Sequence, residues 1–205
     1  MELYNYYVAN TISAHEFLPR TVPQMTLRVQ NVMNAGLPWI VAIHRAGTRN
    51  NQDYFTEQVV GFANIDDFVE PGSMYRYSFD LEIFVHVDYC KMGIGSCLLD
   101  RMLEMCDTSH FLRGGYDWIN RDDYLKNGPS RVVKTINFTF PHDANDQGQP
   151  KQVDSIKKWL KSFGFRASGH LHQVGFKLGK TVDTSIFQRS TTEEIVADQR
   201  PDHPL

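Results

Sequence analysis

The side chains best suited to chemistry in this chain gather in the run Tyr75–Val85, which reads YRYSFDLEIFV. Asp80 and Glu82 lie two residues apart in a strand-like pattern, so their carboxylates share one face of the strand. A carboxylate near the centre of a strand can accept a proton, directly or through water. Arg76 has a planar guanidinium that suits a substrate carboxylate. Each side chain could instead be a solvated group on the strand surface, and the pattern alone does not decide.

A second feature follows at once in VHVDYCKMGIGSCLLDRMLEMC, where a strand-like run meets two glycines and then an amphipathic helix. The first N–H groups of a helix have no partner within it, and the helix dipole favours an anion there. Gly93 and Gly95 leave room for a phosphate to approach the backbone. No Lys-Ser/Thr pair follows Gly95, and Leu98 stands where a dinucleotide fingerprint needs its third glycine. The segment therefore predicts a phosphate site of another kind.

Composition narrows the class of protein. The chain has 205 residues, 41% of them hydrophobic, and a net charge of −3, which predicts a folded core. It has no long basic run, so we expect no nucleic-acid partner. It has no apolar run near 18 residues, so we expect no membrane partner and a cytoplasmic location. The three cysteines lie close together without metal-ligand spacing, which is typical of a reducing compartment.

Periodicity and turn residues predict one α/β domain over residues 1–190, followed by a flexible tail at 191–205. A long polar connection fills 110–130. Helices are expected near the N-terminus and at 23–35, 96–106 and 150–164. Strands are expected at 38–45, 57–68, 75–87, 131–140, 169–179 and 183–189. The Asn-x-Thr sequence at Asn137 falls within a strand and is attributed to chance.

The glycine segment resembles the Arg/Gln-x-x-Gly-x-Gly/Ala motif of the GNAT acetyltransferase superfamily, with Cys90 in place of Arg or Gln. In that family the backbone amides of this loop hold the coenzyme A pyrophosphate, and the pantetheine arm pairs with the end of the preceding strand. The implied cofactor residues are Ile83, Phe84 and Val85 in the strand, and Cys90, Lys91, Met92, Gly93, Ile94, Gly95 and Ser96 in the loop. The implied fold is a central mixed, mostly antiparallel, twisted sheet flanked by helices.

The run before the strand end is similar to the Tyr-Arg-x-Thr-x-Glu pattern of the phosphinothricin N-acetyltransferase subfamily. Tyr75, Arg76 and Ser78 match it and are the implied substrate-binding residues. Asp80 stands at the Glu position, one methylene shorter, and is the first candidate for the catalytic base, with Glu82 in reserve. The C-terminal segment matches that subfamily's ending at Gly169, Leu171, Gly175, Lys177, Gly179, Asp183 and Gln188.

The resemblance implies an acetyl-CoA-dependent N-acetyltransferase that uses no metal and acts by direct attack in a ternary complex. The expected acceptor is the primary amine of an amino acid or amino-acid analogue, which suggests detoxification. A polyamine or peptide acceptor is the alternative. A coenzyme-binding module without turnover is the alternative from another class.

Three departures from the family bear on these expectations. Val153 and Leu160 replace an Asn and a Tyr or His, so the usual proton donor to the departing thiolate is missing. Relatives have a whole strand before the position of Met1, so this strand is either absent or replaced by a partner element. The 110–130 insertion could cover the acceptor site or a dimer face, although a surface excursion is the preferred interpretation. A homodimer is expected by analogy with relatives.

His170 and His172 share a strand face and raise the question of a metal pair. The sequence offers no carboxylate or cysteine at ligand spacing beside them, so two histidines on a polar face is the favoured interpretation.

Overall fold

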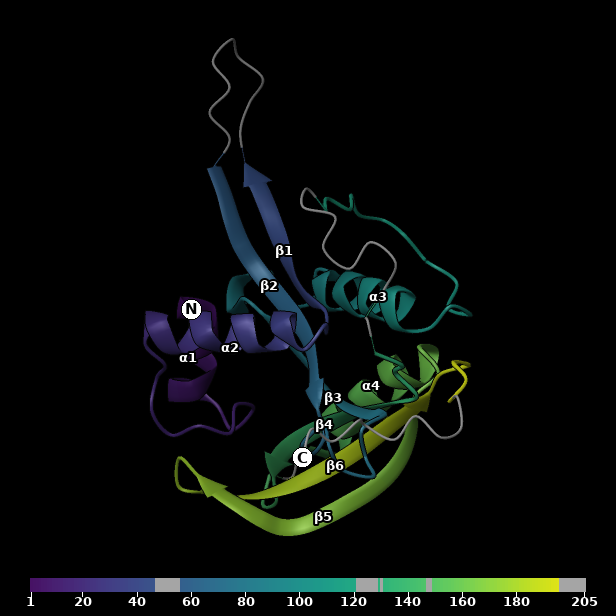
Figure 1. Ribbon diagram of the computed structural model, residues 1–205. Coiled ribbons are helices and arrows are strands. Elements are labelled where there is room, and N and C mark those ends of the chain that lie inside the picture. Colours follow the sequence, from purple (N-terminus) through teal and green to yellow (C-terminus); the bar gives the residue numbers. More distant parts are fainter. Residues whose placement is uncertain (47–55, 121–128, 130, 147–148, 196–205) are drawn as a thin grey trace, which may run out of the picture.

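The computed structural model describes residues 1–46, 56–120, 129, 131–146 and 149–195. Its elements follow one another as two helices, three strands, a short 3-10 turn, a helix, a strand, a helix and two strands (Figure 1). The helices are α1 (Glu2–Asn10), α2 (Val22–Asn34), α3 (Ile94–Cys106) and α4 (Gln149–Ser162), and the 3-10 turn η1 is Val87–Tyr89. The strands are β1 (Trp39–Ala46), β2 (Thr56–Asp67), β3 (Ser78–Val85), β4 (Thr135–Asp143), β5 (Arg166–Lys177) and β6 (Lys180–Ser190).

The strands form a six-stranded sheet in the order β1-β2-β3-β4-β6-β5. Every neighbouring pair is antiparallel except β3 and β4, which are parallel. The predicted mixed, mostly antiparallel sheet is therefore confirmed. No strand precedes α1 in the described part of the chain, and β1 forms one edge of the sheet.

Helices cover both faces of the sheet, because side chains alternate between the faces along each strand. On one face Phe79, Leu81 and the apolar side of α3 share a buried cluster, to which Leu160 of α4 belongs. On the other face Phe62 and Phe84 pack against Tyr4 and its neighbours on α1. Figure 1 shows α1 and α2 on one side of the strands and α3 on the other. Among the described helices, none is long and apolar enough to cross a lipid bilayer.

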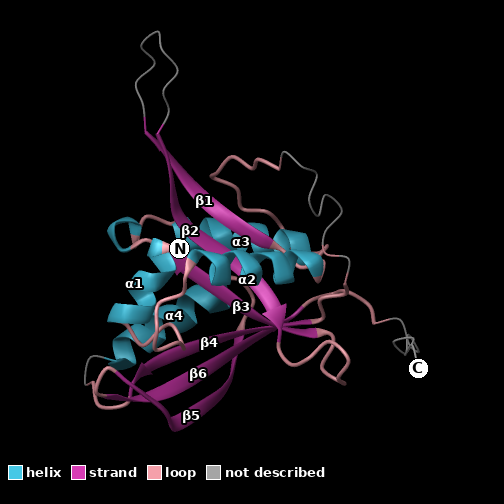
Figure 2. Ribbon diagram, turned by 60° about the vertical axis from the view of Figure 1, so that its left-hand side comes forward, coloured by secondary structure: helices cyan, strands magenta, loops and turns pink. Residues whose placement is uncertain are grey.

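The parallel contact between β3 and β4 is short, and this shapes the whole molecule. Their residues pair only at Ser78–Thr135, Phe79–Ile136 and Asp80–Asn137. Beyond that point β3 stays with β2, while β4 stays with β6 as far as Asp143. The two strands therefore diverge, and Figure 2 shows them meeting at one end and fanning apart. The sheet has a V-shaped opening whose apex lies beside Asp80.

Some boundaries differ from those expected. The strand predicted from residue 75 begins at Ser78, because hydrogen bonds from Arg76 N–H to Ser73 O and from Ser78 N–H to Tyr75 O fold the preceding residues into turns. β4 begins at Thr135 rather than at residue 131. The start of the expected flexible tail is also fixed, since the Thr191 hydroxyl donates to Val133 O at 2.6 Å.

Two aromatic residues of the 110–130 insertion are held against α3. The Tyr116 hydroxyl donates to Asp100 at 3.0 Å, and Arg101 lies over the Trp118 ring at 4.2 Å. These contacts fit the interpretation of a surface excursion. Asp122, Asp123 and Tyr124 of the same segment could also contribute to a cover, but they lie outside the described residues.

Candidate active site

Asp80 lies at the apex of the opening, where β3 and β4 make their last pair. The Asn137 side chain gives it a hydrogen bond, and the other oxygen, Oδ1, is buried with no hydrogen-bond partner among the described residues. Burial raises the pKa of Asp80 to about 6, although the Asn137 hydrogen bond lowers it, and the nearby Glu82 carboxylate raises it further. A carboxylate with this pKa and one free oxygen can accept a proton near neutral pH.

Asn137 is a site residue that sequence reasoning missed. Its Oδ1 accepts a hydrogen bond from Gln188 Nε2 at 3.0 Å, which turns its amide nitrogen toward Asp80. Gln188 belongs to the C-terminal motif singled out from the sequence, and this chain of contacts gives it a role. The contacts from Gln188 to Asn137 and from Asn137 to Asp80 become visible only from the register of β4 against β3 and β6.

Glu82 projects from the same face but has a different environment. It forms an ion pair with Arg28 of α2, and the two side chains are only 25% and 14% exposed. The Arg28 guanidinium also lies over the rings of Tyr4 and Trp39, at 5.4 and 5.7 Å from their centres. A carboxylate held in this way is less available to take a proton from a substrate than Asp80.

Backbone groups of β3 line the opening. The backbone N–H of His86, directly after β3, donates to Val60 O at 2.8 Å, and the backbone N–H of Phe68 donates to Ser78 O. The backbone groups of the even-numbered residues of β3 therefore face β2. The N–H groups of Ile83 and Val85 therefore point toward the opening, where β4 no longer pairs with them. Phe84 contributes differently, because its backbone pairs with Phe62 and its side chain packs against α1.

The glycine loop ends in an uncapped helix. Gly93 is the N-cap of α3 with φ 87°, and no side chain caps the helix. The backbone N–H groups of Ser96 and Cys97 donate to Gly93 O. The backbone N–H groups of Ile94 and Gly95 therefore remain at the free end of the helix. The space around Gly93 is open, since a Cβ there would meet nothing within 4 Å. A phosphate fits this end both electrostatically and sterically.

The other loop residues are arranged around this helix end. Cys90, Lys91 and Met92 are exposed, and Lys91 has a positive φ of 64°. Ser96 accepts a hydrogen bond at 3.0 Å from Trp159 Nε1 of α4, which was not singled out in the sequence. A Cβ on Gly95 would lie 3.9 Å from the Trp159 ring. The next residue, Leu160, is fully buried in the core, so it places no polar group in the opening.

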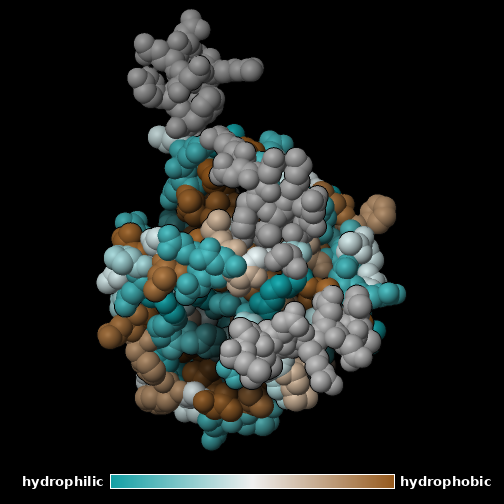
Figure 3. All heavy atoms as spheres, in the orientation of Figure 1, coloured by the Kyte–Doolittle hydropathy of each residue, from teal (hydrophilic) through white to brown (hydrophobic). Residues whose placement is uncertain are grey.

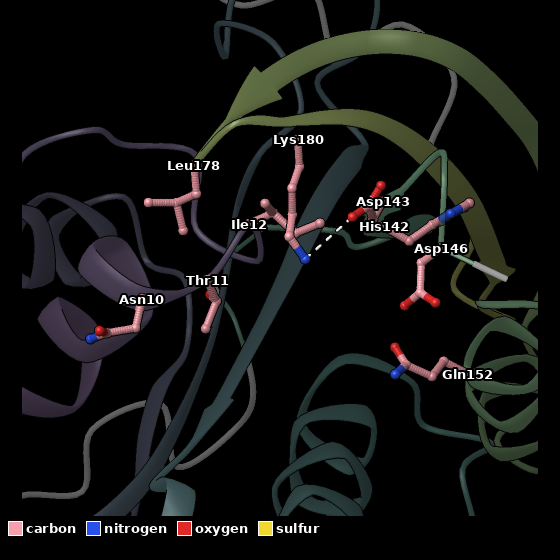
Figure 4. A pocket seen from close by; sticks show the side chains of 9 residues that line it. All are labelled: Asn10, Thr11, Ile12, His142, Asp143, Asp146, Gln152, Leu178 and Lys180. Carbon is pink, nitrogen blue, oxygen red and sulfur yellow. Dashed lines mark ion pairs between the residues drawn. The ribbon is translucent and has the colours of Figure 1, made fainter. Parts of the chain in front are cut away.

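Tyr7 closes the α1 side of the opening. Its hydroxyl donates to Val85 O at 2.6 Å and lies 4.0 Å from Cys90 Sγ. A separate cleft of about 240 Å³ lies between the end of α1 and the end of β4. Figure 4 shows its walls, with Lys180 paired to Asp143 at 3.2 Å across the top. The cleft is lined by Asn10, Thr11, Ile12, His142, Asp143, Asp146, Gln152, Leu178 and Lys180.

The predicted substrate residues lie upstream of Asp80. Tyr75 and Arg76 are in the turn before β3, and Ser78 is its first residue. The Arg76 guanidinium lies over the Tyr77 ring at 4.9 Å and makes no ion pair with a described carboxylate. Tyr75 is 45% exposed and packs edge-on against Phe68.

Known N-acetyltransferases resemble this chain in sequence and in fold. The chain is 24% identical over 187 residues to phosphinothricin N-acetyltransferase from Alcaligenes faecalis, covering 91% of this chain and 74% of that protein. A GNAT superfamily phosphinothricin acetyltransferase from Sinorhizobium meliloti, solved in complex with acetyl-CoA, superposes with a TM-score of 0.67 at 21% identity, over 98% of this chain and 88% of that one. The fold is that of the GNAT acetyltransferases. The predicted resemblance is thereby confirmed.

A second solved GNAT-type fold extends the likeness beyond one subfamily. The ribosomal-protein-alanine N-acetyltransferase from Brucella melitensis superposes with a TM-score of 0.65 at 24% identity, over 92% of this chain and 90% of that one. No protein-family model matches the chain. The relatives named here are N-acetyltransferases with different acceptors, so the GNAT fold leaves the acceptor of this chain open.

The sequence offers no carboxylate at ligand spacing beside His170 and His172, but the sheet brings one next to them. Asp183 of β6 lies beside His170 and His172 of β5 at metal-ligand spacing, because the two strands are antiparallel neighbours. Residues 11 to 13 positions apart in the chain thus share one small patch of surface.

Proposed function

We propose that this protein is an acetyl-CoA-dependent N-acetyltransferase of the GNAT kind. The observation that carries the proposal is Asp80, a buried carboxylate with a pKa of about 6 and an unpartnered oxygen at the apex of the opening. Bound acetyl-CoA would supply the acetyl thioester. The free N–H groups at the start of α3 fit its pyrophosphate, and those of Ile83 and Val85 fit the pantetheine arm.

In this proposal Asp80 takes the proton from the acceptor amine, which makes the amine a nucleophile. Asn137 fixes the orientation of the Asp80 carboxylate, so that Oδ1 faces the amine. The unpaired N–H groups of β3 donate to the carbonyl oxygen of the acetyl group, where negative charge develops. Because Leu160 is apolar and buried, solvent supplies the proton that the leaving thiolate takes up.

The proposed acceptor is the primary amine of an amino acid or amino-acid analogue. Arg76 supports this choice, because its guanidinium has no described carboxylate partner and could bind a substrate carboxylate. A polyamine or peptide amine is the second candidate. It is favoured by the two carboxylates in the lining of the cleft, those of Asp143 and Asp146, of which Asp143 pairs with Lys180.

The test is release of free thiol from acetyl-CoA over a panel of amino acids, their carboxamides and polyamines, with wild type and Arg76→Ala. The amino-acid proposal expects turnover of carboxylate-bearing amines, lost in the variant mainly through a raised KM. If only polyamines were turned over, at the same rate in Arg76→Ala as in wild type, the acceptor would be a polyamine rather than an amino acid. Binding of acetyl-CoA without turnover of any amine would indicate a non-catalytic module.

Assembly as a homodimer is part of the proposal. Both edge strands expose apolar side chains, with Ile43 46% exposed on β1 and Phe176 65% exposed on β5. Figure 3 shows brown apolar surface along the lower edge of the molecule, where β5 lies. Exposed apolar surface on an edge strand favours association with another chain.

A further inference from the structure

The surface patch on the β5–β6 hairpin combines two imidazoles and one carboxylate. His170 Nε2 lies 3.1 Å from Asp183 Oδ2, and His172 Nδ1 lies 3.4 Å from the same oxygen. All three ligand atoms lie within 4.8 Å of one another. This cluster has no part in the proposed acetyl transfer.

The backbone of β5 is shaped around Asp183. The register passes from Leu171–Thr184 to Gly175–Val182, so residues 172–174 together oppose Asp183 in a bulge. Gln173 within it has a positive φ of 52°, and its N–H donates to Asp183 Oδ1 at 2.8 Å. A non-glycine residue in this left-handed conformation is strained, and such residues tend to occur at functional sites. The bulge orients Asp183 Oδ2 toward the histidines and fixes it there.

We propose that His170, His172 and Asp183 bind a divalent transition-metal ion such as Zn²⁺. A metal about 2.1 Å from each of three ligands needs ligand atoms roughly 3.0–3.4 Å apart, and the two distances to Asp183 Oδ2 meet this requirement. Two nitrogens and one oxygen suit zinc, nickel or copper and are a poor set for Mg²⁺. One negative carboxylate partly neutralises the ion.

The surroundings supply the support that a ligating histidine needs. His170 Nδ1 lies 3.2 Å from Ser185 Oγ, and His142 Nε2 lies 3.1 Å from the same hydroxyl. With a metal on Nε2, His170 donates its Nδ1–H to Ser185, which donates in turn to His142. Such an outer hydrogen bond fixes the ring orientation of a metal-bound histidine.

The site is open to solvent on one side, since the His172 side chain is 78% exposed. An ion can therefore enter without rearrangement of the fold and keep water in its remaining positions. Once bound, it would join β5 to β6 near the hairpin that contributes Leu178 and Lys180 to the cleft. Because the ion binds the folded hairpin, it stabilises the folded state.

The test is calorimetric titration of the untagged protein with ZnCl₂, and separately with MgCl₂. The proposal expects saturable binding of one zinc per chain and no comparable binding of magnesium. His172→Gln and Asp183→Asn should each weaken zinc binding by at least roughly tenfold, and Ser185→Ala by about tenfold. Asn at position 183 keeps an oxygen for the Gln173 N–H, so this variant preserves the bulge.

His44→Gln is the matched control, because His44 is an exposed strand histidine outside the cluster. It should bind zinc as wild type does. Thermal melts with and without zinc provide a second readout, with a zinc-dependent rise in Tm that both ligand variants lose. No saturable zinc binding, or equal affinity in wild type and His172→Gln, would mean that the cluster is only a set of His–Asp ion pairs. Equal binding of magnesium would also overturn the proposal.

Discussion

At the residue scale, the burial that raises the pKa of Asp80 also lowers the stability of the folded protein at neutral pH. Since burial raises its folded pKa above the ordinary value, the charged form is penalised in the folded protein. The stability linked to this group is present below its unfolded pKa near 4 and is lost as pH rises through about 6. The proposed role of Asp80 as the base would account for such a cost.

The first prediction follows from that sign. Asp80→Asn should melt at a higher temperature than wild type at pH 7.5, because it removes a buried negative charge. The difference should shrink as pH falls and reach zero well below pH 4, where Asp80 is neutral in both the folded and the unfolded state. Calorimetric melts across this range measure it. A variant that is less stable than wild type at pH 7.5 would show that the charged form of Asp80 is stabilised by the fold.

The second prediction concerns Glu82, whose carboxylate, unlike that of Asp80, is paired with an arginine. Arg28→Met leaves the Glu82 carboxylate without its partner, so we expect a loss of roughly 2 kcal/mol in the free energy of unfolding, between the values for surface and buried pairs. The double variant Arg28→Met/Glu82→Leu should recover most of this loss. Denaturant unfolding provides the measurement. If Glu82→Gln alone abolished acetyl transfer while folding normally, the reserve candidate for the base would replace Asp80.

The sequence could point to Asp80, Glu82 and Arg76 because their types and spacing are visible in one run. It could not rank the carboxylates by environment, because Arg28 is 54 positions away from Glu82 and Asn137 is on another strand. The Asn-x-Thr sequence at Asn137 gives no sign of its contact with Asp80. Partners that come together only through sheet register leave no local signal.

At the element scale, α3 depends on Gly93. Its φ of 87° is a left-handed conformation that costs other residues about 1–2 kcal/mol. The glycine pattern did predict this helix start and its open N-terminus. The V-shaped opening, in contrast, depends on where β3 and β4 stop pairing, and no periodicity encodes that point.

The third prediction compares two glycines. Gly93→Ala should lower stability by about 1 kcal/mol and weaken coenzyme A binding by about tenfold, because it strains the loop whose N–H groups face the phosphate. Gly72→Ala, which has open space and no positive φ, should change neither. Titration calorimetry with coenzyme A measures the affinity. Equal binding by both variants and wild type would remove the anion site from the start of α3.

Trp159 offers an independent readout of the same element. Its indole N–H donates to Ser96 beside the free end of α3, so bound coenzyme A should alter its fluorescence. Because Trp39 and Trp118 also emit, the change should disappear in Trp159→Phe.

At the scale of the whole molecule, the sheet is split between β3 and β4, and the strands of its two halves pair only at the apex. The described contacts that bridge the halves away from the apex include Lys177 Nζ to Ala14 O at 2.8 Å. The order of helices and strands followed from the sequence, since apolar periodicity and turn residues are local. The way in which the two halves join could not be predicted from the sequence. It depends on contacts such as this one, between residues 163 positions apart in the chain.

The fourth prediction concerns assembly. The exposed apolar side chains on both edge strands lead us to expect a dimer, with a mass near twice the 23.6 kDa of one chain. Light scattering coupled to size-exclusion chromatography gives the mass directly. A single-chain mass at micromolar concentration would contradict the expectation without affecting the proposed chemistry.

The central claim is that Asp80 accepts the proton during acetyl transfer. The most direct measurement is the pH profile of kcat/KM, by thiol release, for wild type, Asp80→Asn and Asp80→Glu. The account predicts that wild-type activity rises through about pH 6, that Asp80→Asn loses roughly 10²–10⁴-fold with this inflection absent, and that Asp80→Glu retains it. An unchanged profile in Asp80→Asn would contradict the account.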